Sequence, residues 1–197
     1  MKFNCAYSEL IEIHKLVPNP KKLIEILKTS KNLLRFMDSF VEMQVFDNDG
    51  REFFVKIDYQ DIKSLSTMRW RADRKTDSYI SIVTTHEKKV LTQSRLILNP
   101  PKGLYCDHRN GDPTDNRRDN LRDATHSENM RNRKSLKAGS KYKGIYFSKD
   151  RNLWVAQIYT NGKNKNIGRF HTDKQAAIAY NEQAKKHYGN FAKLNEI

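Results

Sequence analysis

Apolar and polar residues alternate along two short runs in the first half of the chain, at residues 41–46 and 53–57. A period of two is typical of strands that bury one face. The segment between them, 47–50, reads Asp-Asn-Asp-Gly, and Asn and Gly tolerate the positive φ that tight turns require. The pattern predicts a β-hairpin here, and weaker patterns predict strands at residues 79–83 and 90–98.

A period of three to four, typical of amphipathic helices, occurs in two other places. Between residues 21 and 40 the apolar positions suit one or two helices, after the Pro-containing turn at 17–20. Between residues 61 and 70, Ile62, Leu65 and Met68 share one face of a short helix. The first hundred residues therefore predict a mixture of strands and short helices.

The last third of the chain has the clearest pattern of secondary structure. Strands are predicted at residues 143–147, 153–160 and 165–170, and an alanine-rich helix at 173–188. Gly189 is a typical stop signal for that helix. Three strands followed by one helix predict a small α+β module in which the helix covers one face of the sheet.

Alternation along the middle strand assigns side chains to the two faces of this sheet. The face expected to pack beneath the helix carries Trp154, Ala156 and Ile158. The other face carries Val155, Gln157 and Tyr159. We therefore expect the second set to be available for a partner.

The net charge indicates what kind of partner to expect. The chain has 37 Lys and Arg against 23 Asp and Glu, a net charge of +14. Because neutralising phosphates releases condensed counterions, such a surplus favours nucleic acid. Residues 138–197 hold 11 of the basic and only 4 of the acidic side chains, so this part is expected to contact nucleic acid.

Cysteine content and hydropathy exclude several other classes of protein. Two cysteines far apart in sequence, Cys5 and Cys106, exclude a cysteine-rich zinc site and a disulfide framework. No apolar run reaches the roughly 18 residues of a membrane-spanning helix. These features predict a cytoplasmic protein without a membrane partner.

One run of residues has a spacing that indicates chemistry. Asp107-His108 is followed 12 residues after the histidine by Asn120, and nine residues later by Asn129. We expect a strand that ends at Asp107-His108, a polar connection, a second strand near 120–122, and a helix that begins near residue 126. Acidic residues within the connection neighbour several arginines, so turn capping and ion pairing are expected of them.

This run resembles the HNH endonucleases, and in particular the branch of phage and intron homing enzymes in which Asn replaces the last His. The resemblance implies a ββα-metal core that binds one Mg²⁺ or Mn²⁺ through Asp107 and Asn129. It further implies that His108 accepts a proton from the attacking water and that Asn120 holds the connection in place. Hard divalent ions prefer such oxygen ligands, and a histidine exchanges protons near neutral pH. His126, three residues before Asn129, remains an alternative ligand or phosphate contact.

The last block, residues 141–195, resembles the ethylene-response-factor-type DNA-binding domain. The matching pieces include Lys143-Gly144-Ile145, the strand from Trp154 to Ile158, and the closing Asn195. In that family the exposed sheet face lies in the major groove. The positions that the resemblance assigns to DNA contact, together with the basic residues beside them, are Lys143, Tyr146, Gln157, Tyr159, Lys163, Asn164, Lys165, Asn166 and Arg169.

Taken together, these patterns predict an α+β protein with three parts: residues 1–40 of unknown role, an HNH nuclease domain at 41–135, and a DNA-binding domain at 141–197. The expected function is a site-recognising, divalent-metal-dependent homing endonuclease acting on double-stranded DNA. We expect a monomer that needs no small-molecule cofactor and acts on phage or host DNA. The alternatives are a catalytically inert DNA-binding regulator that keeps the HNH fold, and a nuclease directed to RNA or to a nucleic-acid structure.

Overall fold

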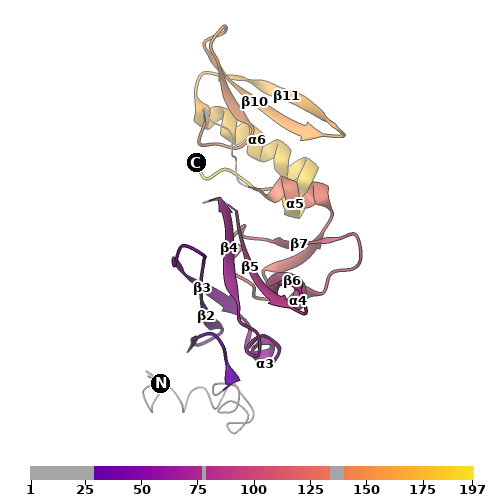
Figure 1. Cartoon of the computed structure of the whole chain (residues 1–197). Coiled ribbons are helices and arrows are strands. Elements are labelled where there is room, and N and C mark those ends of the chain that lie inside the picture. The colour runs from indigo at the N-terminus through magenta and orange to yellow at the C-terminus, as the bar shows by residue number, and fades with distance from the viewer. Residues whose placement is uncertain (1–28, 77–78, 134–139) are drawn as a thin grey trace. The chain divides into compact units, whose positions relative to one another are not determined.

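The structure is a computed structural model, which describes residues 29–76, 79–133 and 140–197 (Figure 1). The chain divides into two compact units. The first unit comprises residues 1–102 and 112–123, and the second comprises residues 103–111 and 124–197. In this division, part of the HNH motif groups with the C-terminal residues, and the domains 41–135 and 141–197 stay a prediction.

An antiparallel sheet with strand order β1-β2-β3 forms the core of the first unit. Its strands are β1 (Leu34–Phe36), β2 (Val41–Phe46) and β3 (Glu52–Ile57). The predicted hairpin is confirmed, with Val41 paired to Ile57 and Phe46 to Glu52. Alternation buries most of one face, and the fully buried side chains are Val41, Met43, Val45, Val55 and Ile57.

A second antiparallel sheet in this unit has the order β4-β5-β6. It consists of β4 (Arg71–Thr76), β5 (Tyr79–His86) and β6 (Lys89–Thr92). The strand predicted at 79–83 is confirmed and extends further. The sequence patterns did not predict β4, which is rich in charged residues but pairs along β5 from Arg71 to Thr76.

Three predicted elements of the first unit differ from the structure. Where a helix was predicted at 21–40, residues 34–36 instead form the strand β1, because they pair with β2 and place Leu34 opposite Met43. Residues 21–28 of that prediction lie outside the described residues. The helix predicted at 61–70 is a 3-10 turn, η1 (Tyr59–Asp61), followed by α3 (Ile62–Leu65). It ends early because the Trp70 backbone N–H donates to the Asn32 side-chain oxygen, which holds the chain in an extended path.

The strand predicted at 90–98 is correct only in its first part. After β6 the chain forms a helix, α4 (Gln93–Leu98), which ends where Asn99 adopts a φ of +51°. The helix carries Gln93 into the core, where its side chain is fully buried and accepts a hydrogen bond of 2.7 Å from Asn116. This contact crosses 23 residues and is one reason why a local pattern does not predict the helix.

The predicted strands and helix around the HNH motif are confirmed. They are β7 (Tyr105–His108), β8 (Leu121–Ala124) and α5 (His126–Asn132), and β7 and β8 form a two-stranded sheet. Within the second unit, α5 contacts β7. The strand–strand–helix order predicted from the spacing is therefore present.

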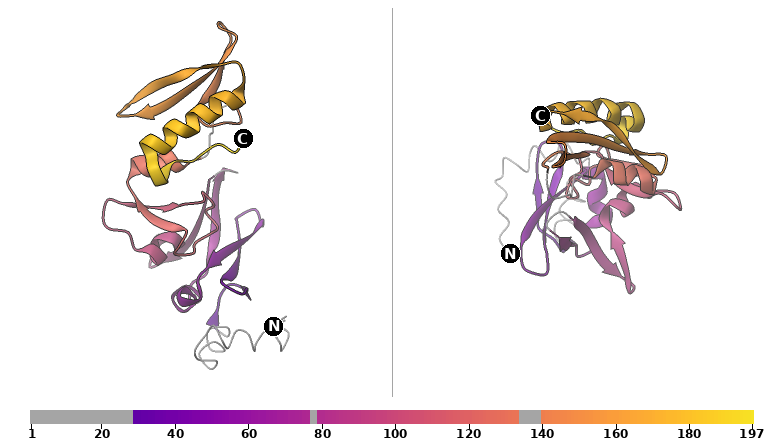
Figure 2. Two further views of the ribbon diagram at one scale, coloured as in Figure 1. Left: turned by 180° about the vertical axis from the view of Figure 1, so that it is seen from behind. Right: turned by 90° about the horizontal axis from the view of Figure 1, so that it is seen from above.

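The rest of the second unit is a three-stranded antiparallel sheet with one helix, as predicted. The strands are β9 (Ile145–Ser148), β10 (Leu153–Thr160) and β11 (Lys163–Phe170), and the helix is α6 (Asp173–Tyr188), followed by a short 3-10 turn, η2 (Gly189–Phe191). Figure 2 shows α6 along one face of the sheet. Ala156 and Ile158 are buried against this helix with Trp154 packed beside them, and the residues that complete the cluster on α6 are Ala176, Ala177, Tyr180, Ala184 and Tyr188.

A local signal marks each end of α6, and the one at the C-terminal end, Gly189, was predicted. Thr172 and Gln175 form a capping box in which each side chain bonds the other's backbone N–H, and Gly189 ends the helix. In the described parts of the chain, no helix combines the length and the apolar character needed to cross a bilayer.

Candidate functional site

Asp107 and His108 lie next to each other at the end of β7. Successive side chains of a strand point to opposite faces, and the burial of the two residues differs accordingly. Asp107 is 3% exposed, whereas His108 is only half-buried. The strand therefore places a carboxylate inside the unit and an imidazole nearer the solvent.

Asn132, the last residue of α5, holds the Asp107 carboxylate. Its side-chain nitrogen lies 3.1 Å from each oxygen of that carboxylate and 2.6 Å from the backbone oxygen of His108. An amide nitrogen carries two hydrogens, so it can serve the carboxylate and the carbonyl together. Asn132 is 4% exposed, and it fixes the end of β7 to the end of α5.

Asn129 precedes Asn132 by three residues on the same helix. Residues with this spacing are neighbours on a helix surface, with Cβ atoms about 5–6 Å apart. Asn129 is half-buried, and its carboxamide makes no hydrogen bond to any other described residue. The Asp107 carboxylate and the Asn129 carboxamide oxygen fit the donor chemistry of a hard divalent ion.

The sequence patterns did not identify Asn132 as a site residue. Its spacing of three residues from Asn129 was the signal in the sequence that could have identified it. Only the contact between α5 and β7 shows what its side chain does. Within residues 29–76, 79–133 and 140–197 there is no cluster of three or more His, Cys, Asp or Glu arranged to hold a metal. The predicted ligand pair, Asp107 and Asn129, is not a set of that kind.

The start of α5 is stabilised by a capping box. The Thr125 hydroxyl accepts from the Glu128 backbone N–H at 3.3 Å, and the Glu128 carboxylate accepts from the Thr125 backbone N–H at 2.8 Å. The Glu128 side chain thus caps the first turn of the helix. His126 is exposed, and its ring lies 5.5 Å from that of Tyr105. The capping box sets where α5 begins, and so the position of Asn129 along it.

Asn120 lies in the part of the connection that belongs to the first unit. It is 7% exposed, and its side-chain nitrogen donates to the Asp115 carbonyl oxygen at 2.7 Å. The same connection bonds to β3, where the Lys56 backbone N–H donates to Thr114 and its carbonyl accepts from Asn116, both at 2.8 Å. Asn120 therefore closes the turn that ends this connection.

The acidic residues of the connection form turns and ion pairs, as predicted. Asp112 accepts from the backbone N–H and hydroxyl of Thr114, at 2.9 and 2.7 Å. Asp115 is 2% exposed and receives two bonds of 2.8 Å from the Arg117 guanidinium. These bonds hold the pKa of the Asp115 carboxyl below its usual value, although burial opposes the shift. The Asp115 carboxylate is therefore held in an ion pair with Arg117.

The register of the C-terminal sheet shows which predicted DNA contacts share a face. Partners across an antiparallel pair lie on the same face. Tyr159 pairs with Asn164, Gln157 with Asn166, and Val155 with both Arg169 and Tyr146. We call the sheet face that carries these seven residues the open face. Among the described residues of the second unit, no helix or strand covers this face (Figure 2). Val155 is nevertheless only 4% exposed, which corrects the expectation that its side chain is available to a partner.

Lys163 and Lys165 pair with Thr160 and Ile158, so they belong to the opposite face from Asn164. Both lysines are exposed, as are Asn164, Asn166 and Arg169. Tyr146 is 45% exposed and Tyr159 is 58% exposed. The open face thus offers polar and aromatic side chains, while the two lysines lie on the opposite face of the sheet.

Lys143 differs from the other predicted DNA contacts. Its ammonium donates to the backbone oxygen of Arg131 and, at 2.6 Å, to that of Arg133, at the end of α5. Burial, with a contribution from the charge of Lys193, lowers the pKa of Lys143 to about 8. Its backbone is held by Asn195, which accepts from the Lys143 N–H at 2.7 Å. The structure therefore gives this side chain an intramolecular role that competes with DNA contact.

Comparisons with known proteins agree with this motif. The HNH endonuclease family matches residues 99–131. Protein 3.8 of Escherichia phage T7 is 36% identical over 95 residues, which cover 48% of this chain and 78% of that protein. An uncharacterized HNH endonuclease, L560, of Acanthamoeba polyphaga mimivirus is 33% identical over 97 residues, which cover 49% of this chain and 50% of that protein. No solved structure is significantly similar to this chain.

The matched segment 99–131 contains β7, β8 and nearly all of α5. It ends one residue before Asn132, the residue that holds the Asp107 carboxylate. The relatives and the motif lead to the same assignment. The chain belongs to the same family as Protein 3.8, and its β7–β8–α5 segment matches the HNH endonuclease family.

Proposed function

We propose that the chain is a homing-type endonuclease that recognises a site in double-stranded DNA and hydrolyses its phosphodiester bonds with one Mg²⁺ or Mn²⁺ per active site. One observation carries the proposal: Asn132, which holds the buried Asp107 carboxylate, lies one helical turn after Asn129 on α5, and the Asn129 carboxamide forms no hydrogen bond with any other described residue. This arrangement lies in a segment that matches the HNH endonucleases.

Each residue of the site has a role in this proposal. Asp107 and Asn129 hold the ion through side-chain oxygens. His108, on the other side of β7 from Asp107, accepts the proton of the attacking water. Asn120 keeps the connection between the two strands closed. The bound ion supplies stabilisation of the charge that develops on the phosphate.

The C-terminal sheet is proposed to anchor the enzyme as an ethylene-response-factor-like module. A sheet can enter the major groove and read base edges with its side chains. The side chains assigned to this role are on the open face, and Lys163 and Lys165 are assigned to phosphates. Two linked DNA-contacting parts raise each other's effective concentration on one duplex. In this proposal the protein acts as a monomer without a small-molecule cofactor.

Cleavage of supercoiled plasmid by the purified full-length protein tests the proposal. We expect nicked or linear DNA with Mg²⁺ or Mn²⁺ and intact plasmid with EDTA, because the carboxylate–carboxamide pair requires an ion to act on a phosphodiester. Binding of the duplex without cleavage in either metal would instead support an inert DNA-binding regulator. Preferential cleavage of RNA in a competition with duplex DNA would contradict the assigned substrate.

Asn132 provides a second prediction for the same site. In Asn132→Ala the Asp107 carboxylate loses its amide donor, and we expect metal affinity or cleavage rate to fall by about 10–100-fold. The Mg²⁺ concentration for half-maximal cleavage should rise, and Mn²⁺ binding without DNA, followed by calorimetry, should weaken. The control is Ser127→Ala, an exposed position on the same helix. If a folded Asn132→Ala protein binds Mn²⁺ as the wild type does, the positioning role is wrong.

A further inference from the structure

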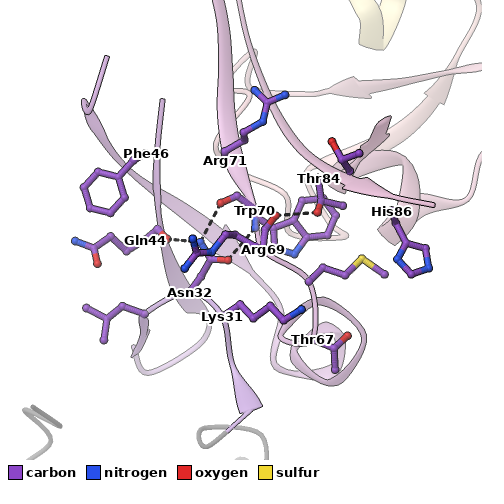
Figure 3. Close-up of a pocket in the computed structure, with 13 residues that line it drawn as sticks. Lys31, Asn32, Gln44, Phe46, Thr67, Arg69, Trp70, Arg71, Thr84 and His86 are labelled. Carbon is purple, nitrogen blue, oxygen red and sulfur yellow. Dashed lines mark hydrogen bonds between the residues drawn. The ribbon is translucent and has the colours of Figure 1, made fainter. Parts of the chain in front are cut away.

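The first unit contains a pocket that none of the predicted site residues lines. Its volume is about 590 Å³, and its walls come from the residues before β1, from β2, from residues 67–71 and from the end of β5 (Figure 3). All of these segments lie within residues 31–86, so the pocket belongs to the first unit alone. It is separate in sequence from the HNH segment at 99–131.

Hydrogen bonds between distant residues fix the shape of this pocket. The Asn32 side-chain nitrogen donates to the backbone oxygens of Gln44 and Trp70, at 2.9 and 3.0 Å, and its oxygen accepts from the Trp70 N–H at 2.8 Å. The Thr84 hydroxyl donates to the Arg69 carbonyl at 2.8 Å. Figure 3 shows these bonds between the pocket residues. Arg69 and Arg71 therefore project from a backbone that is held on both sides of Trp70.

The charge of the lining is entirely positive. Among the described residues, Lys31, Arg69 and Arg71 line the pocket and no Asp or Glu does. None of these three cations forms an ion pair or a side-chain hydrogen bond with another residue in the described parts of the chain. Unpaired cations around one pocket create a positive potential that extends over about a Debye length, roughly 8–10 Å at physiological salt.

Three properties of the pocket lining indicate which kind of anion it would bind. Lys31 and Arg69 are exposed, so each can reach a group on the surface without first breaking a side-chain contact to another described residue. Guanidinium and ammonium groups bind phosphate oxygens strongly, the former in a bidentate manner. Phe46, also in the lining, is 46% exposed and offers an apolar surface to a sugar or base.

We infer that this pocket binds the phosphodiester backbone of DNA as a contact separate from both the HNH site and the open face of the C-terminal sheet. The inference rests on the proposed function, since it assigns one more surface of the enzyme to the same duplex. Contacts to phosphates position a protein on DNA without reading sequence. The pocket thus contributes affinity and register, and it takes no part in the chemical step.

The test compares the salt dependence of DNA binding in three full-length proteins. They are the wild type, Lys31→Ala/Arg69→Ala, and the control Lys88→Ala/Lys89→Ala, which removes the same charge from the exposed end of the β5–β6 hairpin in the same unit. Binding to a labelled duplex is measured in EDTA by fluorescence anisotropy between about 50 and 200 mM salt, the range over which phosphate contacts dominate the change in affinity.

Each phosphate contact contributes about 0.9 to the slope of log affinity against log salt. We therefore expect the slope of the pocket variant to be shallower than that of the wild type by about 1.8. Between about 50 and 200 mM salt, the fold-decrease in the affinity of the variant should then be about tenfold smaller than that of the wild type. The control should keep the wild-type slope. Cleavage at saturating DNA should be unchanged in both variants, because neither touches the HNH residues.

The outcomes separate the inference from the proposed function. Equal slopes in the pocket and control variants, with tight binding by the wild type, would overturn the pocket assignment alone. A pocket variant that keeps the wild-type slope but loses thermal stabilisation by inorganic phosphate would show a site for free anions instead. A wild type without affinity for duplex DNA would overturn both the assignment and the proposed function.

Discussion

Replacing His108 with alanine is expected to abolish detectable cleavage, since loss of a general base typically costs about 10²–10⁴-fold in rate. Affinity for duplex DNA in EDTA should remain that of the wild type, because Asp107, Asn132 and the C-terminal sheet keep their contacts. Single-turnover cleavage of a labelled duplex, with anisotropy on the same DNA, measures the two quantities separately.

His126 is the matched comparison for this experiment. It lies at the start of α5, and its exposed ring contacts Tyr105. His126→Ala is therefore expected to retain most of the cleavage rate. A His108→Ala protein that cuts as fast as the wild type, or a His126→Ala protein that is equally inactive, would refute the assignment of the proton acceptor.

Replacing Gly144 with alanine is expected to destabilise the C-terminal module strongly. Gly144 has a φ of +75°, and an added Cβ would lie 2.3 Å from the Tyr180 ring and 2.7 Å from the Gln157 carbonyl oxygen. The left-handed conformation costs a non-glycine residue about 1–2 kcal/mol, and overpacking adds about 1–3 kcal/mol. The melting temperature should fall by about 10 °C or more, measured by calorimetry.

Gly162 provides a control with the same backbone conformation. Its φ is +77°, but nothing lies within 4 Å of an added Cβ. The free energy of unfolding of Gly162→Ala should therefore fall only by the cost of the left-handed conformation, about 1–2 kcal/mol. An equal loss of stability in the two variants would contradict the close packing of Tyr180 against Gly144.

The elements that could be predicted are those whose signals are local. The hairpin of β2 and β3 has two runs that largely alternate around an Asp-Asn-Asp-Gly turn, and α6 has a capping residue at one end and glycine at the other. Elements without a local signal were missed. β4 carries charges at most positions and forms through its pairing with β5, while α4 follows a short apolar run that fits a strand equally well.

The candidate site divides in the same way. The spacing of Asp107, Asn120 and Asn129 identified the motif without any structure. The role of Asn132 could not be inferred, because it depends on a contact with Asp107 across 25 residues. Lys143 was assigned to DNA from a resemblance, whereas the structure places its ammonium on the carbonyl oxygens at the end of α5.

The amino-acid sequence by itself determined the positive charge of this protein, the strand–strand–helix order of its HNH segment and the sheet-plus-helix module that follows. These depend on composition, on short periods and on capping residues, all of which act over a few positions. Only the tertiary structure decided which side chains support Asp107, which lysine is held inside the chain and where three cations come together around a pocket. Such contacts join residues that are far apart in sequence, and their free energy arises only when packing brings them together.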